Sequence, residues 1–193
     1  MKGCRPLTKD EVQKILSLED IIFRDKVLFI MGINTGYRIS ELLSLRVSDV
    51  IAPGGEALGL VSVKAQNMKG KMGRAVKLNS KTKALLKGFC KGRGLDEPLF
   101  KSRCKGQHRE LKAVGRSRAH DIIKAMFAKA KVFGSVATHT MRKTFAQNMR
   151  RLLNGDIVNL MRAMGHRSIN TTMAYMAFDN AMIDDAIEQL SFF

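Results

Sequence analysis

The rest of the chain is organised around the stretch from Thr138 to Tyr175, which opens with Thr138-His-Thr-Met-Arg-Lys-Thr-Phe145. A second part follows one expected helix later and reads Met164-Gly-His-Arg-Ser-Ile-Asn-Thr-Thr-Met-Ala-Tyr175. Together the two parts hold two of the four His and one of the two Tyr in the chain. Far upstream, Thr35-Gly-Tyr-Arg-Ile-Ser-Glu-Leu42 supplies another Arg between two expected helices. These polar side chains fall at the ends of elements, outside the apolar stripes.

His139 and Arg142 are three residues apart, so they share one face of the helix that we expect over 138–153. Thr138 is suited to cap this helix. A helix N-terminus lowers the pKa of a nearby His, which favours the neutral imidazole. Taken alone, an H-x-x-R pair is more often a surface or capping pair than a catalytic one.

The remaining pattern predicts a mainly α protein with a small antiparallel β-hairpin, an α+β arrangement. Thr8 and Glu11 have the spacing of a capping box, and Gly36 suits a left-handed helix end. The predicted helices cover 8–18, 18–34, 41–45, 80–91, 118–131, 138–153, 156–164 and a segment from 168, with Ser40, Ser80 and Ser168 at helix starts; the strands cover 58–63 and 74–78. Ile22, Leu152, Ile169 and Met173 are among the apolar residues expected to face inward.

The net charge of the chain indicates which kind of molecule it binds. The chain has 34 Lys and Arg against 17 Asp and Glu, which gives +17. Between Leu60 and His120 the only acids are Asp96, Glu97 and Glu110. This excess favours nucleic acid, because basic groups near phosphates release counterions. An anionic membrane is less favoured, since no basic amphipathic helix with an aromatic face is evident.

Composition predicts a soluble, cytoplasmic protein. Hydrophobic residues make up 45% of the chain, enough for a core, and no apolar run approaches the roughly 18 residues of a membrane span. No secretory leader opens the chain. Cys4, Cys90 and Cys104 include no C-x-x-C pair, so neither a disulfide framework nor a zinc module is indicated.

The side chains singled out above suit phosphodiester chemistry without a metal or cofactor. Such a reaction requires that the phosphate charge be matched, the leaving oxygen protonated and the nucleophile activated. Arg38, Arg142, His139, His166 and Tyr175, together with a hairpin Lys, offer those functions. No P-loop sequence is present, so use of ATP is not indicated.

Four motifs resemble those of the tyrosine recombinase (phage integrase) family, in the family's order and at about its spacings. They are Thr35–Leu42, His139-Thr-Met-Arg142, Gly165-His166 and Thr171-Thr-Met-Ala-Tyr175. The resemblance covers nearly the whole chain from Leu7 to Tyr175. It implies the family's catalytic-domain fold, double-stranded DNA as the partner, and metal-free DNA strand breakage and joining.

The resemblance also implies roles for single residues. Tyr175 would attack the scissile phosphate, form a 3′-phosphotyrosyl link and free a 5′-hydroxyl. Arg38 and Arg142 would hold the non-bridging oxygens. His139 would accept a proton, and His166 would hydrogen-bond to the phosphate.

The hairpin adds further expectations. Lys69 matches the family's general acid, and Lys71, two residues on, is the alternative for that role. Lys71 and Arg74 are expected to contact DNA from the hairpin tip. Glu41 matches a common acidic position beside the first Arg, and we expect it to orient the site.

The implied organisation is a catalytic domain over 1–178 and a tail helix over 179–193. The tail would dock either on a neighbouring protomer or on its own domain. A DNA-clamping domain commonly precedes the catalytic domain, and we expect it either to be absent here or to have been cut away, since Leu7 already begins the catalytic domain. The family implies a monomer in solution, a homotetramer on paired DNA sites, and a nucleoid location when bound to DNA.

Two other functions stay open from the sequence. One is a DNA-binding regulator that keeps the fold without cutting, which would have no use for Tyr175. The other is a type IB topoisomerase-like enzyme that relaxes supercoils through the same covalent step. Recombinant product would distinguish a recombinase from both.

Overall fold

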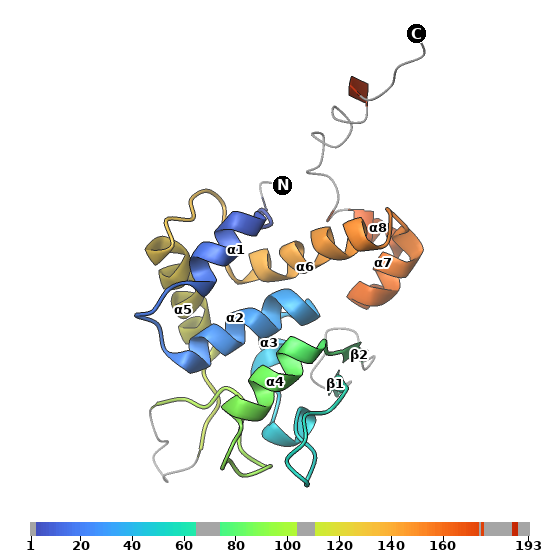
Figure 1. The fold of residues 1–193 in the computed structure, drawn as a ribbon. Helices are drawn as coiled ribbons and strands as arrows, with labels where there is room; N and C mark the ends of the chain where they lie inside the picture. Colours follow the sequence, from blue (N-terminus) through green and yellow to red (C-terminus); the bar gives the residue numbers. More distant parts are fainter. Residues whose placement is uncertain (1–2, 65–73, 104–110, 174, 176–186, 189–193) are drawn as a thin grey trace. The chain divides into compact units, whose positions relative to one another are not determined.

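The computed structural model describes residues 3–64, 74–103, 111–173, 175 and 187–188 of the chain. Over those residues the backbone is mainly helical with one two-stranded sheet (Figure 1), which confirms the predicted fold class. The elements are α1 (Lys9–Leu16), α2 (Phe23–Thr35), α3 (Ile39–Leu43), the 3₁₀ helix η1 (Val47–Asp49), β1 (Leu60–Val63), β2 (Arg74–Lys77), α4 (Ser80–Phe89), α5 (Arg116–Lys129), α6 (Thr138–Leu152), α7 (Ile157–Met164) and α8 (Ile169–Met173).

The chain divides into two compact units, Met1–Phe145 and Ala146–Phe193. The first unit holds α1 to α5, the sheet and the first turns of α6. The second holds the end of α6 together with α7 and α8, which pack against each other. The predicted tail over 179–193 lies outside the described residues except for 187–188.

Helix α2 forms the centre of the first unit's core. It packs against α3, α4 and α5 (Figure 1). Val27, Leu28, Phe29 and Met31 are all buried, and the Phe29 ring meets the Phe127 ring of α5 edge to face, with centroids 6.3 Å apart. A helix that is apolar on several sides belongs inside the domain, so the other helices are arranged around it.

The predicted antiparallel pair of strands is confirmed. Strands β1 and β2 are antiparallel, with Leu60 opposite Lys77 and Val63 opposite Arg74. Along β1 the burial alternates, with Val61 and Val63 inside, as expected for a strand with one face on the core. The connecting residues 65–73 lie outside the described residues.

Several helix ends are formed by the capping side chains and glycines that we predicted. The Thr8 hydroxyl accepts from the Glu11 amide, and the Glu11 carboxylate accepts from the Thr8 amide, so the capping box forms. Gly36 and Gly165 end α2 and α7 in the left-handed conformation, with φ of 63° and 62°. A left-handed residue at a helix end is usually glycine, because the absent Cβ removes the steric penalty.

Two predicted helix starts are displaced by one residue. Asn79, and not Ser80, caps α4, because its side-chain oxygen accepts from the amide three residues on. Thr138 is the first residue of α6 and does not precede it. There the Thr140 hydroxyl accepts from the Ala137 amide instead. In both cases a side-chain oxygen accepts from a backbone amide at the helix start, where amides have no partner within the helix.

Four apolar residues expected to face inward are exposed, namely Ile22, Leu152, Ile169 and Met173. Ile22 precedes α2, since that helix begins several residues later than predicted. Leu152 is 77% exposed as the last residue of α6. In α8 the buried residue is Thr172, so a polar contact replaces the expected apolar face.

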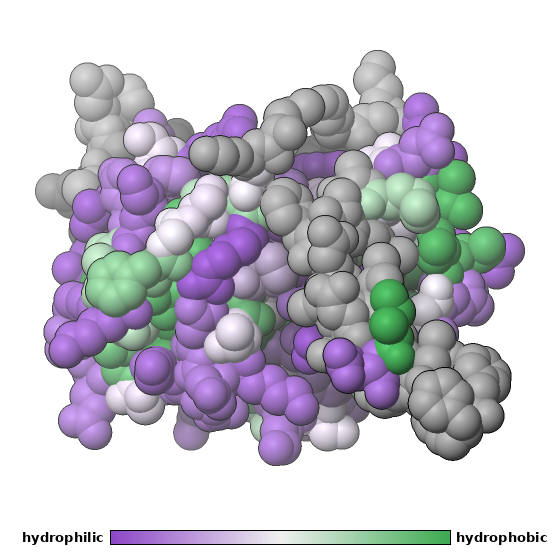
Figure 2. Space-filling view, turned by 90° about the horizontal axis from the view of Figure 1, so that it is seen from above, coloured by the Kyte–Doolittle hydropathy of each residue, from purple (hydrophilic) through white to green (hydrophobic). Residues whose placement is uncertain are grey.

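The surface is mainly polar on the face seen from above in Figure 2. Hydrophilic residues dominate its described part, and apolar side chains form small separate groups. None of the helices built by the described residues is long and apolar enough to span a bilayer.

Two glycines of α2 allow the first turns of α6 to lie close against it. A Cβ built on Gly32 would lie 2.6 Å from the Met141 sulfur, and one on Gly36 would lie 2.3 Å from a Phe145 ring carbon. Both pairs have a spacing of four residues, so they line one face of each helix. Larger side chains at these positions would push the segment that carries Arg142 away from α2.

We therefore expect Gly36→Ala to destabilise the protein more than Gly55→Ala does. Both glycines have positive φ, 63° and 84°, which costs an L residue about 1–2 kcal/mol. Only at Gly36 does the new methyl group meet a neighbour, since nothing lies within 4 Å at Gly55. Overpacking should add about 1–3 kcal/mol. Urea unfolding measures the difference, and equal losses in the two variants would contradict the close approach of Phe145.

Candidate catalytic site

Arg38 and Glu41 form a pair at the start of α3. Arg38 occupies the N-cap position, where Ser40 was expected to begin the helix. The Glu41 carboxylate accepts from both the backbone N–H and the Nη1 of Arg38, each at 2.8 Å. Glu41 is buried, whereas the Arg38 side chain keeps 31% of its surface exposed. The carboxylate therefore orients a guanidinium that solvent, or an anion, can reach.

Arg142 comes from the first turns of α6 and is buried. Its Nη1 donates to the carbonyl of Gly36, the residue that ends α2. Arg38 lies two residues beyond that carbonyl. The turn after α2 therefore links both predicted phosphate-binding arginines, although they are 104 residues apart in the sequence.

His139 lies one turn before Arg142 on α6 and is exposed. Neighbouring atoms nevertheless shield part of its ring from water, and this partial burial lowers the pKa of the imidazole. The positive charges of Arg142, Lys143 and Arg38 lower the pKa as well. We predicted this direction from the helix N-terminus. The structure adds a different cause, partial burial beside three cations. A neutral His is the form that accepts a proton.

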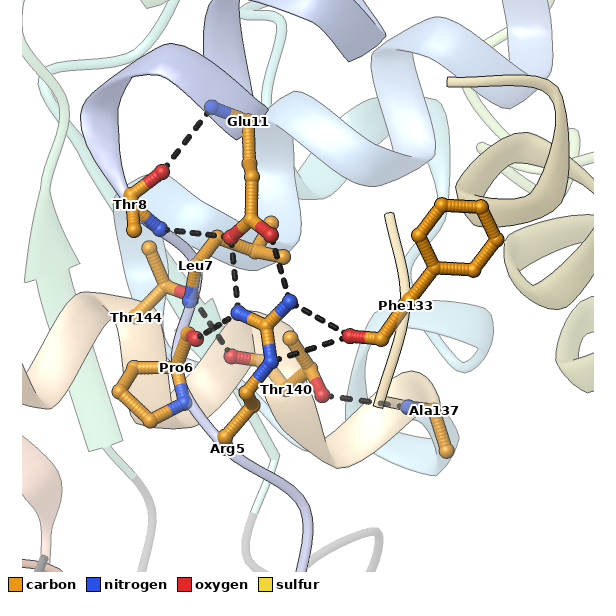
Figure 3. Close-up of polar contacts among 9 residues, drawn as sticks. All are labelled: Arg5, Pro6, Leu7, Thr8, Glu11, Phe133, Ala137, Thr140 and Thr144. Atoms are coloured by element: carbon orange, nitrogen blue, oxygen red, sulfur yellow. Dashed lines mark hydrogen bonds and ion pairs between the residues drawn. The ribbon is translucent and has the colours of Figure 1, made fainter. Parts of the chain in front are cut away.

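The start of α6 is held by the N-terminal segment 5–8 (Figure 3). The Arg5 guanidinium donates to the Glu11 carboxylate and to the Phe133 carbonyl, which lies in the loop before α6. The Leu7 amide donates to the Thr144 hydroxyl at 2.9 Å. Through these bonds, the N-terminal segment holds the part of α6 that carries His139 and Arg142.

The structure places Arg74 differently from the expectation of an exposed charge at the hairpin tip. It is the first residue of β2 and only 7% exposed. Its Nη2 donates to the Thr35 carbonyl at 2.8 Å, and its guanidinium lies 5.0 Å from the centre of the Tyr37 ring. It also lies 5.7 Å from the centre of the Phe145 ring. Arg74 is thus an interior residue.

Lys69 and Lys71, the candidates for general acid, lie outside the described residues. Their roles stay predictions, as does the DNA contact of Lys71.

His166 and Tyr175 lie together in the second unit. His166 follows Gly165 at the end of α7, and its buried ring places Nδ1 3.0 Å from the Thr172 hydroxyl of α8. The His166 and Tyr175 ring centroids are 5.1 Å apart. The Thr172 hydroxyl thus fixes the orientation of the imidazole beside the predicted nucleophile.

The two tyrosines differ in what they could do. Tyr37 is 1% exposed, and its hydroxyl lies 2.9 Å and 2.6 Å from the carbonyl oxygens of Val61 and Arg74. Burial raises the pKa of Tyr37 to about 12. A sealed, hydrogen-bonded phenol is unsuited to attack a substrate. Tyr175 is half-buried and next to a His.

Sequence reasoning missed two contributors to these clusters. Thr172 hydrogen-bonds to His166, and the charge of Lys143 lowers the pKa of His139. Both are polar residues within the quoted motifs, which was the available signal. Arg74 was named, but it was expected at the hairpin tip and not in the interior. Within the described residues, no three His, Cys, Asp or Glu side chains group as a metal site would require.

With this geometry described, comparison with known proteins assigns the family. The chain belongs to the phage integrase family, whose model matches residues 5–182. The family and the mainly helical catalytic-domain fold that the motifs predicted are thereby confirmed.

Individual relatives agree with this assignment. The chain is 33% identical over 156 residues to the probable integrase/recombinase YoeC of Bacillus subtilis, covering 81% of this chain and 78% of that protein. It is 27% identical over 175 residues to the tyrosine recombinase XerA of Saccharolobus solfataricus, covering 90% of this chain and 52% of the relative. The chain therefore spans about half the length of this archaeal relative.

A solved structure shows the same fold. The XerH site-specific recombinase, in a post-cleavage complex with its palindromic difH substrate, matches 96% of this chain and 53% of its own with a TM-score of 0.72. The sequence identity is 22%. The arrangement of helices is therefore preserved although few residues are shared.

We expect the His139 imidazole to titrate below the ordinary pKa of 6.5. A lowered pKa means that the neutral form persists at more acidic pH than in an unfolded chain. An NMR titration of the histidine ring resonances measures this. Lys143→Met removes one neighbouring positive charge and should raise the value. A wild-type pKa at or above 6.5 would contradict the described surroundings of the ring.

Proposed function

We propose that this chain is the catalytic part of a site-specific recombinase that cleaves and rejoins double-stranded DNA. The contrast between the two tyrosines carries the proposal. One is sealed in the core by two carbonyl oxygens, and the other lies against a histidine within a family motif. Membership of the phage integrase family supports it. The DNA substrate of the XerH complex supports double-stranded DNA as the partner.

The proposed reaction forms one bond as it breaks another. The Tyr175 phenol oxygen attacks the scissile phosphorus, the bond to the 5′-oxygen breaks, and a 3′-phosphotyrosyl link results. The phenol proton passes to His139, and Lys69 protonates the leaving 5′-oxygen, with Lys71 as the alternative acid. Attack by a 5′-hydroxyl on the link reverses these steps and restores the DNA strand without another energy source.

The arginines stabilise the charge that develops on phosphorus. Arg38 and Arg142 bind the non-bridging oxygens, and His166 adds a hydrogen bond. Glu41 supports the arrangement through its bonds to Arg38. The guanidinium that Glu41 orients needs no rearrangement to meet an anion, and such preorganisation is what makes electrostatic catalysis effective.

The assembly and location that we propose follow the family. The chain is a monomer in solution and forms a homotetramer on paired DNA sites, in the cytoplasm at the nucleoid. Light scattering of the protein alone and with a duplex carrying two sites would measure this. A tetramer without DNA would contradict it.

Covalent trapping tests the chemistry. The protein is incubated with nicked duplexes, drawn from the ends of its source element or from a library, whose 5′-hydroxyl fragment dissociates after cleavage. We expect a denaturation-resistant adduct with wild type and none with Tyr175→Phe, while DNA binding persists. Peptide mapping should place the nucleotide on Tyr175.

Tyr37→Phe removes the only other phenol and should retain the adduct, although at a lower rate. An adduct formed by Tyr175→Phe would overturn the mechanism. DNA binding without any adduct would favour a non-cutting regulator, and supercoil relaxation without recombinant product would favour a topoisomerase-like enzyme.

A further inference from the structure

Arg74 belongs to the interior of the first unit, where a charged group requires a reason. Its guanidinium lies 5.0 Å from the Tyr37 ring centre and 5.7 Å from the Phe145 ring centre, and it donates to the Thr35 carbonyl. Burial, and after it the charge of Arg142, lower the pKa of Arg74 to about 10. Two guanidinium groups thus share one region although they repel each other.

The end of α2 makes this arrangement possible. The carbonyls of Thr35 and Gly36, the last residue of the helix and its C-cap, accept from Arg74 and Arg142 respectively. Carbonyls at a helix C-terminus carry partial negative charge and favour cations. The two arginines therefore bind consecutive carbonyls of one turn, and Arg38 follows directly after Tyr37.

The backbone of Arg74 ties the same turn to the sheet. The Tyr37 hydroxyl lies 2.6 Å from the Arg74 carbonyl oxygen and 2.9 Å from that of Val61 on β1. Both strands of the hairpin thereby contact the residue between Gly36 and Arg38. Arg74 contributes a side-chain contact and a backbone contact to this junction.

We propose that Arg74 is a positioning residue that holds the turn after α2, and through it Arg142 and Arg38, in the geometry needed for phosphate binding. Its buried guanidinium acts on the protein and does not contact DNA. The kinetic test of this inference rests on the proposed function. The structural test, a crystal structure of a variant, does not depend on it. It also replaces the expectation that Arg74 binds DNA from the hairpin tip.

The kinetic test compares Arg74→Met with Arg93→Met. Arg93 makes the same kinds of contact elsewhere in the first unit. Its guanidinium lies 5.0 Å from the Phe89 ring centre, and it donates to the Pro98 and Leu99 carbonyls. Both variants therefore lose a ring contact and bonds to backbone carbonyls, and Arg93→Met loses an ion pair with Glu97 as well. Circular dichroism with thermal unfolding measures what each loss costs in stability.

We expect Arg74→Met to slow adduct formation on a nicked duplex by about 10–100-fold, because small misplacements of binding groups have large effects on rate. Arg93→Met should stay within about twofold of wild type. An unchanged cleavage rate would overturn the proposal.

Arg74→Lys distinguishes the positioning role of the guanidinium from an effect of its positive charge alone. It also serves as the test if the Met variant does not fold. Lysine keeps a positive charge but lacks the planar group that stacks on aromatic rings while donating to a carbonyl. A slowed rate in this variant supports positioning. Full activity would show that only charge matters and would overturn the proposal.

A crystal structure of a folded Arg74 variant tests the inference without any cleavage assay. The expected result is a displaced Thr35–Gly36 turn in which Arg142 no longer donates to Gly36. An unchanged Arg142 would overturn the positioning role. If wild-type protein formed no adduct, the proposed function would fail while this structural result would still decide the role of Arg74.

Discussion

The first unit depends on the turn that ends α2. Gly36 has a positive φ there, has no room for a Cβ against Phe145, and offers its carbonyl to Arg142. The preceding carbonyl binds Arg74. Because the C-terminal carbonyls of a helix carry partial negative charge, one turn can hold two interior cations that would otherwise repel each other. The helix end, the hairpin and the first turns of α6 are joined at this point.

Positive charge serves this protein in two ways. The overall excess of +17 is a long-range property that favours attraction of a polyanion. The arginines of the candidate site act at short range, because a buried glutamate and backbone carbonyls set their directions. Partial burial, and after it the charges of Arg142, Lys143 and Arg38, lower the pKa of His139. The cations that we propose for phosphate binding therefore also favour the neutral form of the predicted proton acceptor.

The motifs were sufficient to find the candidate site residues but not their surroundings. Arg38, His139, Arg142, His166 and Tyr175 could be identified because their types, order and spacing match the family to which the chain belongs. The catalytic roles of these residues are proposals that trapping experiments address. Contacts such as the one between Thr172 and His166 had no signal in hydrophobic periodicity, since a buried threonine looks like an exposed one in sequence.

Local patterns in the chain were enough to predict the fold class, the hairpin, the capping box at Thr8 and the left-handed helix end at Gly36. These features depend on interactions among neighbouring residues, which local patterns encode. The burial of Arg74 and the bond from Arg142 to Gly36 became visible only in the folded structure. The bonded residues are 39 and 106 positions apart, so no local pattern relates them. A charged group can be buried only where folding brings partners around it, which for Arg74 are a carbonyl and aromatic rings.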